Sequence, residues 1–450
     1  MTAVPGTSAR PARWTEDPAV LATRRLDRSG FDPGGTPAAV VLAESVDDVV
    51  ATLVHAHAER IPVVVRGAGT GLSGGAVAGD GAVVLDVSGL DRIREISAAD
   101  ELAVVEAGVI TADLDAAAAV HGLRYAPDPA SVAISTIGGN IATNAGGLRC
   151  AKYGVTRDSV LGLDVVLADG RRISTGRRTV KGVTGYDLTG LFVGSEGTLG
   201  VVVAATVRLR PIPPRTATLA AWFDDFAGAA AAAAAITANG LQPAVAELLD
   251  PACVDAITAD PAAGADSPRG AAFLLVQTDG LGADAEIDAV RRVVAATATH
   301  VDVTTDPVRA EALVATRRAA LPALERLGRV LIEDVAVPRS RLPEAVEAIA
   351  GISRRRGIRI ATMAHAADGN LHPILVLEPG RDLDEAVWDT AGEVFTAALR
   401  LGGTLTGEHG VGLLKRRWLA DELGPDVLGL QRELKAVFDP RAILNPGKAL

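Results

Sequence analysis

The sequence predicts an α+β fold in two parts, and three observations carry this prediction. Residues 37–66 read as strand, helix and strand, and the glycine-rich loop that follows leads to another strand. Three prolines (Pro211, Pro213 and Pro214) then interrupt a strand-like run and mark a domain boundary. After residue 215, strands alternate with amphipathic helices, which is typical of helices that cover a sheet. We expect a long, mostly antiparallel sheet there, with helices on one face.

The order of elements divides the chain into four segments. Residues 1–36 form a lead-in, 37–214 the first domain, 215–405 the second, and 406–450 a turn-rich tail that returns to the first. Ser45 stands three residues before Asp48, so a capping pattern predicts a helix beginning after residue 45. Further on we expect a helix at 111–121 and a hairpin that turns at 169–170.

Residues 61–77 (IPVVVRGAGTGLSGGAV) organise the first domain. Glycines at 67, 69, 71, 74 and 75 let backbone N–H groups turn inward, which suits a diphosphate. The window 69–74 matches the pattern G-x-G-x-x-G, whose glycines open a helix in a Rossmann unit. Here a second apolar strand follows, so the pattern does not indicate a Rossmann fold. An ordinary glycine-rich hairpin remains an alternative.

Two further segments are rich in small residues. Residues 125–154 (YAPDPASVAISTIGGNIATNAGGLRCAKYG) show little periodicity and many Gly, Asn, Ser and Thr residues. A loop of this length is either disordered or wraps a ligand, and its low charge favours a cofactor-wrapping loop. The segment 185–200 is again dense in glycine.

Composition excludes several classes of protein. The chain has 450 residues, 48% of them hydrophobic and 22% charged, and a net charge of −11, which argues against a nucleic-acid partner. It shows neither an apolar run long enough for a transmembrane segment nor a secretory signal, and its two cysteines (Cys150 and Cys253) form no motif. We therefore expect a cytoplasmic protein, or one held peripherally at the inner face of the membrane.

Three of the seven histidines occur in two short glycine-containing motifs. His365 and His372 flank a turn between two apolar strands, and a hairpin can bring such residues onto one face. Glu408 and His409 follow in the motif TGEHG. Two imidazoles and a carboxylate form a normal three-ligand set for zinc with an open position. A buried histidine that serves only the core is the alternative.

Six segments together resemble one family: VVVRGAGTGLSGGA, STIGGNIATNAGGLRCAKYG, GLFVGSEGTLG, HAADGNLHP, TGEHGVG and LNPGK. They are similar to the FAD-linked oxidases of the vanillyl-alcohol oxidase/p-cresol methylhydroxylase (PCMH) superfamily. Within it they are most similar to the D-2-hydroxyacid dehydrogenase branch, which includes D-lactate dehydrogenase, D-2-hydroxyglutarate dehydrogenase and the flavoprotein component of glycolate oxidase. The resemblance covers nearly the whole chain from residue 37. It implies a two-lobed, PCMH-type FAD-binding domain, an α+β cap of ferredoxin-like type, and a short C-terminal segment that returns to the FAD domain.

The resemblance also implies the residues that hold FAD. The diphosphate loop would consist of Arg66, Gly67, Ala68, Gly69, Thr70, Gly71, Leu72, Ser73 and Gly74. The flavin would be lined by Pro127, Ser131, Gly138, Gly139, Asn140, Thr143, Asn144, Gly147, Tyr153, Gly154, Glu196, Gly197 and Val202, with Asn445 approaching the ring from the tail. Some relatives attach FAD through a histidine in the glycine loop. This loop has neither histidine nor cysteine, so we expect non-covalent FAD.

The resemblance also assigns roles to the residues of the two histidine-containing motifs. His365, His372 and Glu408 would bind Zn²⁺ or another divalent metal, and His409 would be the general base. Arg317 would bind the substrate carboxylate. Its neighbour Arg318 could take this role instead, or could be an ordinary solvated charge on the helix surface. The motif departs from the family at Ala364 and Ala367, where relatives usually have glycine, and we expect a modest geometric effect.

The function implied is oxidation of a small D-2-hydroxy acid, with electrons passed to a quinone, a cytochrome or an electron-transfer flavoprotein rather than to NAD. Relatives specific for hydroxyglutarate add a basic residue for the distal carboxylate. Here Glu333 stands in the corresponding stretch and would repel it, which favours D-lactate or glycolate. The alternatives are a D-2-hydroxyglutarate dehydrogenase, a glycolate oxidase flavoprotein that is inactive without partner subunits, and a metal-dependent hydrolase. A homodimer is also compatible with the sequence.

Overall fold

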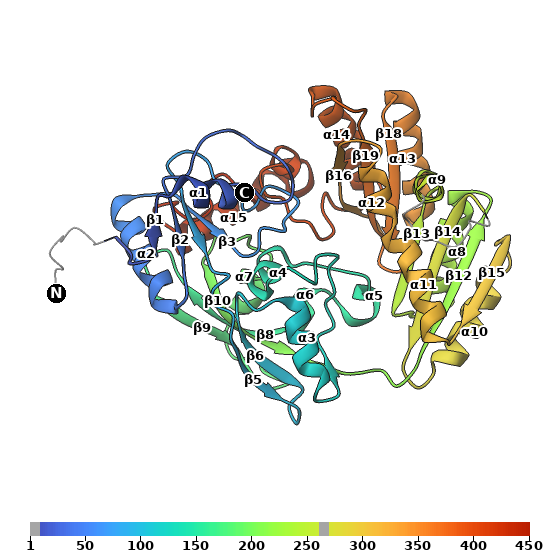
Figure 1. Ribbon diagram of the computed structural model, residues 1–450, viewed down its shortest axis with the longest axis horizontal. Helices are drawn as coiled ribbons and strands as arrows, with labels where there is room; N and C mark the ends of the chain where they lie inside the picture. The colour runs from blue at the N-terminus through green and yellow to red at the C-terminus, as the bar shows by residue number, and fades with distance from the viewer. Residues whose placement is uncertain (1–9, 261–269) are drawn as a thin grey trace. The chain divides into compact units, whose positions relative to one another are not determined.

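The computed structural model describes residues 10–260 and 270–450 and divides the chain into two compact units. Unit 1 consists of Met1–Gly146, Gly154–Ile212 and Glu408–Leu450, and unit 2 consists of Gly147–Tyr153 and Pro213–Gly407. Figure 1 labels their elements. Residues 1–9 of the expected lead-in lie outside the described residues. Its described part contains strand β1 (Trp14–Thr15) and helix α1 (Pro18–Arg24).

The first sheet of unit 1 carries the glycine-rich loop. Its strand order is β1-β2-β4-β3, with β2 (Ala39–Leu42), β4 (Val83–Asp86) and β3 (Val63–Arg66) all parallel. Helix α2 (Val46–Glu59) joins β2 to β3 and begins with the predicted capping box of Ser45 and Asp48. No helix occurs between β3 and β4. The structure thus confirms that the loop is not a Rossmann turn, and parallel pairing also excludes a hairpin.

The second sheet of unit 1 is antiparallel, with strand order β5-β6-β10-β8-β9. The hairpin predicted at residues 169–170 joins β8 to β9, and the predicted helix at 111–121 is α3, ending at Ala119. The strands are β5 (Ile93–Ser97), β6 (Leu102–Glu106), β8 (Val160–Val166), β9 (Arg172–Gly176) and β10 (Val201–Arg208). Shorter elements are β7 (Leu123–Arg124), α4 (Ile137–Thr143), α6 (Thr156–Ser159), α7 (Leu188–Phe192) and β11 (Arg210–Pro211).

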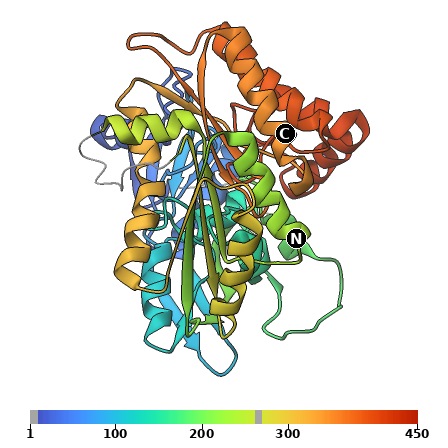
Figure 2. The ribbon, with the colours of Figure 1, turned by 90° about the vertical axis from the view of Figure 1, so that its right-hand side faces the viewer.

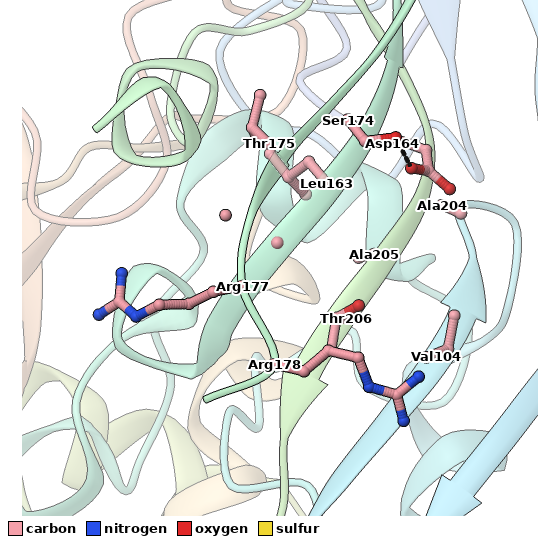
Figure 3. A pocket seen from close by; sticks show the side chains of 12 residues that line it. Val104, Leu163, Asp164, Ser174, Thr175, Arg177, Arg178, Ala204, Ala205 and Thr206 are labelled. Carbon is pink, nitrogen blue, oxygen red and sulfur yellow. Dashed lines mark hydrogen bonds between the residues drawn. The ribbon is translucent and has the colours of Figure 1, made fainter. Parts of the chain in front are cut away.

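A small hollow lies over β8, β9 and β10 (Figure 3). Small side chains such as Ala204 and Ser174 leave the space, and Asp164 accepts a hydrogen bond from the Ser174 hydroxyl at 2.7 Å. None of the residues predicted to bind FAD lines this hollow.

The C-terminal tail packs into the first sheet of unit 1. It contains the short 3-10 helix η2 (Arg416–Trp418) and helix α15 (Leu419–Phe438), which is interrupted at Gly424. Leu444 forms a parallel bridge with Val63 and is fully buried in the hydrophobic core. The tail therefore adds backbone hydrogen bonds and apolar side chains to the strand that precedes the glycine-rich loop.

Unit 2 is built on an eight-stranded antiparallel sheet of order β15-β12-β14-β13-β18-β19-β16, with β17 paired to β19. The strands are β12 (Thr216–Phe223), β13 (Val245–Leu249), β14 (Ala272–Asp279), β15 (His300–Thr304), β16 (Val330–Ile332), β17 (Val335–Ala336), β18 (Arg359–His365) and β19 (Asn370–Val376). The helices are α5 (Cys150–Tyr153), α8 (Phe226–Ala238), α9 (Pro251–Ala259), α10 (Ala283–Val294), α11 (Pro307–Arg318), α12 (Ala320–Glu325), α13 (Leu342–Arg356) and α14 (Glu385–Arg400), with the 3-10 helix η1 (Arg339–Arg341) before α13.

Helices cover both faces of this sheet rather than the single face expected (Figure 2). Helices α9, α11 and α12 pack on the face that carries Trp222, Phe273 and Met363. Helices α8, α10 and α13 pack against the same strands without joining that cluster. Strands buried on both faces read as continuous apolar runs, as β13 and β14 do, so the signal for a second helical layer was present in the sequence but was not used. The predicted antiparallel sheet and the α+β class are confirmed.

Asp250 links helix α9 to strand β18 in the core of unit 2. Its carboxylate accepts hydrogen bonds from the N–H groups of Cys253 and Thr362, both at 2.8 Å. Burial raises the pKa of Asp250 from its ordinary value of 3.8 to about 6, against the opposing effect of these hydrogen bonds. The folded state therefore binds this proton more tightly than the unfolded chain does.

We expect the stability of the chain relative to Asp250→Asn to depend on pH. Because the folded pKa of Asp250 is raised, its contribution is fully present below pH 3.8 and is lost as the pH rises through 6. The shift predicts a loss of about 2–3 kcal/mol between pH 4 and pH 7. Urea unfolding of both proteins at the two pH values measures it. Other titrating groups cancel in the difference, and a constant difference would contradict the prediction.

Candidate active site and cofactor cradle

The two small-residue loops predicted to bind a cofactor come together in unit 1. A Cβ on Gly67, directly after β3, would overlap the hydroxyl of Thr136. Thr136 caps helix α4 by accepting a hydrogen bond from the Gly139 N–H at 3.2 Å. Only a residue without a side chain permits this approach. The loop after β3 and the start of α4 therefore form one continuous lining.

Arg66 lies beneath the glycine-rich loop. Its Nη1 donates to the carbonyl of Leu26 at 2.7 Å, and a Cβ on Gly69 would overlap its guanidinium. The side chain is buried, and this burial lowers the pKa of Arg66. The loop thus combines inward-facing backbone with a buried cation, the combination that binds phosphate groups.

The predicted loop at 125–154 is more ordered than its sequence suggests, since it contains α4. The Asn140 amide donates to the Thr111 hydroxyl at 2.7 Å, and Asn144, in the left-handed conformation, ends the helix. The side-chain oxygen Oδ1 of Asn144 accepts from the Arg157 N–H at 2.9 Å. These two amides hold the lining in place through bonds within the protein.

Glu196 and Asn445 join the tail to this cradle. The Glu196 carboxylate accepts hydrogen bonds from the N–H groups of Val411 and Gly412, both at 2.8 Å. Asn445 donates to the Glu196 carbonyl at 2.6 Å and accepts from the Val65 N–H at 3.2 Å. Burial raises the pKa of Glu196, and the two N–H groups act against this rise.

Two residues predicted to line the flavin, Gly147 and Tyr153, belong to unit 2. The Tyr153 hydroxyl donates to Asp279 at 2.7 Å, and Lys152 donates to the Asp279 carbonyl at 2.9 Å. Asp279 ends strand β14. Residues 147–153 are thus anchored to the sheet of unit 2.

Strands β18 and β19 bring the two predicted metal ligands together. Their antiparallel register pairs His365 with Asn370 and Met363 with His372, so both histidines lie on one face. The imidazole centroids are 5.0 Å apart with the rings nearly perpendicular, and one ring nitrogen from each lies within 4.8 Å of the other. Both side chains are buried. The hairpin of β18 and β19 thus brings the two histidines together, as the sequence analysis predicted.

Each imidazole has a buried carboxylate on its Nδ1 side. His365 Nδ1 lies 2.6 Å from Glu247 Oε1, and His372 Nδ1 lies 3.9 Å from Asp334 Oδ1. An ionised Glu247 makes Nδ1 of His365 the donor, so Nε2 carries the lone pair. Metal-binding histidines are oriented by carboxylates in this way, so the donor set fits a divalent metal such as zinc.

Glu247 is the residue that the sequence analysis missed. It lies on β13 opposite His365, and Arg317 Nε donates to its other oxygen at 2.8 Å. The Glu247 side chain is fully buried and that of Arg317 is 12% exposed, whereas Arg318 pairs with Glu311 at the surface. A lone acid inside the apolar run AVAELL was the available signal.

Glu408 and His409 directly follow Gly407, the last residue of unit 2. The Thr406 hydroxyl donates to Asp334 at 2.6 Å, and Gly407 lies so close to Asn370 that a Cβ would overlap its amide. The next two residues are assigned to unit 1, where the Ser73 hydroxyl donates to the His409 carbonyl at 3.1 Å.

Residues 212–449 match the family model of FAD-linked oxidases, C-terminal domain, and residues 37–176 match the FAD binding domain. The glycolate oxidase subunit GlcD of Bacillus subtilis is 43% identical over 418 residues, which are 92% of this chain and 88% of that protein. The chain belongs to the FAD-linked oxidases.

Two further relatives of this FAD-linked oxidase carry different names. The D-lactate dehydrogenase of Archaeoglobus fulgidus is 34% identical, with 97% of this chain and 95% of that protein covered. The D-2-hydroxyglutarate dehydrogenase of Stutzerimonas stutzeri is 33% identical, with 92% and 90% covered. The solved structure of p-cresol methylhydroxylase has the same fold, with a TM-score of 0.78, 18% identity, and 97% and 93% covered.

The chain is thus an FAD-linked oxidoreductase related to the D-2-hydroxyacid dehydrogenases, as the motifs predicted. The cradle fits FAD, because glycine positions 67 and 69 leave no room for side chains beside a buried arginine. Within residues 10–260 and 270–450, no helix combines the length and apolar character needed to cross a membrane.

We expect Glu247 and Arg317 to be energetically coupled. Replacing either by leucine leaves the other without its buried opposite charge and should lower the free energy of unfolding by about 3–5 kcal/mol. The double variant should lose clearly less than the sum of the two. Arg318→Leu is the matched control, with an expected change within about 0.5 kcal/mol because its partner is exposed. Additive losses in urea unfolding would contradict the coupling.

Proposed function

We propose that this FAD-linked oxidase converts a small D-2-hydroxy acid, D-lactate or glycolate, to the 2-oxo acid. The observation that carries the proposal is the buried pair of His365 and His372, each with a carboxylate behind it. Arg317, a cation able to bind a carboxylate through two N–H groups, shares Glu247 with His365. Relatives named as glycolate oxidase subunit and D-lactate dehydrogenase support the substrate class.

The metal would be held by His365, His372 and Glu408, with Zn²⁺ the best match to this donor set. Glu408 is the covalent neighbour of Gly407, which lies beside Asn370 at the start of strand β19. A bound Zn²⁺ would act as a Lewis acid that lowers the pKa of the substrate hydroxyl. Glu247 would keep His365 in the tautomer that offers Nε2.

Arg317 would bind the substrate carboxylate with the guanidinium N–H groups that Glu247 and Met363 do not occupy. His409 would take the hydroxyl proton at a ring nitrogen as neutral imidazole. FAD, when bound, supplies the oxidant that accepts the hydride from C2 at its N5. The substrate thereby loses one proton and one hydride and becomes the 2-oxo acid.

FAD would bind non-covalently, with residues 66–74 around its diphosphate and the linings from α4, Glu196 and Asn445 around the flavin. The segments 37–214, 215–405 and 406–450 would then serve as FAD domain, cap and returning tail. The loop after β3 contains no histidine or cysteine for a covalent bond.

Glu333 favours a substrate with one carboxylate. It precedes Asp334, its N–H donates to the Pro373 carbonyl at 3.0 Å, and its side chain is buried. A second carboxylate near this acid would be repelled, which argues against D-2-hydroxyglutarate as the preferred substrate.

The electron acceptor would be a quinone, a cytochrome or an electron-transfer flavoprotein. The glycine-rich loop connects β3 to β4 without a helix, so it does not form a Rossmann site for NAD. Because the relative from Bacillus subtilis is named as a subunit, partner subunits would complete the reaction. The protein would act in the cytoplasm or at the inner face of the membrane.

We expect the purified chain with FAD to lose its flavin absorption when D-lactate or glycolate is added without oxygen. L-lactate is the control and should leave the spectrum unchanged. Addition of NAD⁺ should not restore the bands, whereas an artificial electron acceptor should. Bleaching by D-2-hydroxyglutarate alone would refute the role given to Glu333, and failure to take up FAD would refute the oxidase proposal.

We expect His372→Ala to lose its metal. Zinc content measured by mass spectrometry should fall from about one ion per chain to almost none, and bleaching by substrate should slow at least about 100-fold. His300→Asn, on the edge strand β15, is the matched control and should keep both the zinc content and the rate of bleaching. Equal zinc content in the two variants would show that the pair does not hold the metal.

A further inference from the structure

Lys448 is a buried cation in the C-terminal tail for which the proposed chemistry has no use. Its side chain is only 4% exposed, and its Nζ has no hydrogen-bond partner among the described residues. The backbone around it is held firmly: its N–H donates to the Asn445 carbonyl at 3.3 Å, and that of Ala449 donates to Gly412 at 3.1 Å. The backbone of Lys448 is thus fixed, and its buried ammonium has no acceptor among the described residues.

The charges that act on the Lys448 ammonium are the carboxylates of Asp27 and Glu196. Both are already occupied: Asp27 accepts from Ser29 and from the Ala76 N–H at 3.2 Å, and Glu196 accepts from two backbone N–H groups. Two more cations are close by. The charge of Lys415 acts to lower the pKa of Glu196, and Arg416 donates a hydrogen bond to the Leu450 carbonyl at 2.7 Å.

These two carboxylates border the glycine-rich loop. A Cβ on Gly71 would lie 3.7 Å from Asp27 Oδ2, and one on Gly75 would lie 3.6 Å from Glu196 Oε2. Ala449, the neighbour of Lys448, bonds to Gly412, and Leu413 donates to the Ser73 carbonyl at 2.9 Å, so Lys448 lies in the part of the tail that contacts the glycine-rich loop.

We propose that Lys448 is a cofactor-binding residue whose ammonium donates a hydrogen bond to an anionic or carbonyl oxygen of FAD. The oxygen belongs either to the diphosphate or to the pyrimidine end of the flavin ring. The proposal rests on the placement of FAD along the glycine-rich loop given above. It accounts for a feature of the cradle that is unfavourable in the protein alone, a buried ammonium with unused donors.

Binding of FAD is then linked to a proton. Burial lowers the pKa of Lys448 to about 8, and the charges of Asp27 and Glu196 act in the opposite direction. An oxygen acceptor from FAD favours the charged ammonium and raises this pKa in the complex. FAD affinity should therefore fall as the pH rises from 7 to 9.

The test compares three full-length variants, stripped of FAD and titrated with it while flavin fluorescence is followed. Lys448→Met should bind FAD about 10- to 100-fold more weakly at pH 7 and lose the pH dependence between 7 and 9. Lys448→Arg keeps a charge and should recover most of the affinity. Lys435→Met is the control, because this buried lysine already donates to Asp439 and to the Leu444 carbonyl at 3.0 Å.

Thermal unfolding without FAD adds a second measure. Lys448→Met should unfold at the same or a higher temperature than the parent, since it removes a cation without partners, whereas Lys435→Met should unfold at a lower temperature. The midpoint potential of the bound flavin separates the two oxygens. A fall in potential in Lys448→Met identifies the flavin ring, and weaker binding at unchanged potential identifies the diphosphate.

Equal FAD affinity of Lys448→Met and the parent at both pH values would overturn this inference alone. If the parent chain itself fails to bind FAD, the placement of FAD fails with it.

Discussion

One buried carboxylate sets the geometry of unit 2. Glu247 lies on a central strand with no exposed surface, and an isolated ionised carboxylate in such a position would be costly. It is tolerated because His365 and Arg317 each bond to one of its oxygens. The same two bonds fix the orientation of the imidazole and the position of the guanidinium. The proposed metal ligand and the proposed substrate-binding residue are therefore held by a single acid.

The cradle of unit 1 depends on a different constraint, the return of the chain end. Asn445 bonds both to Val65 on β3 and to Glu196, so it joins segments that are far apart in the sequence. Glu196 in turn bonds to the backbone at Val411 and Gly412. A lining made of loops is normally mobile, and these bonds fix it by satisfying the polar groups of each loop with those of another.

Much of this could be predicted from the sequence because the signals were local. Capping at Ser45, the turn at Gly170 and the strand after the glycine-rich loop depend on neighbouring residues. The meeting of His365 and His372 also followed, since both flank one turn. Glu247 could not be placed in this way, because its partners come from β18 and from the end of α11 and only sheet order and register bring them together. The second helical layer of unit 2 was missed although the continuous apolar runs of its strands indicated it.

The proposed ligand sites of the two units have buried charges of opposite sign beside them. This difference indicates which kind of ligand each site would bind. Unit 2 places acidic Glu247 and Asp334 behind two imidazoles, an environment that attracts a cation. Unit 1 places Arg66 and Lys448 around a loop of glycines, an environment that attracts an anion. A divalent metal and a dinucleotide meet these two requirements.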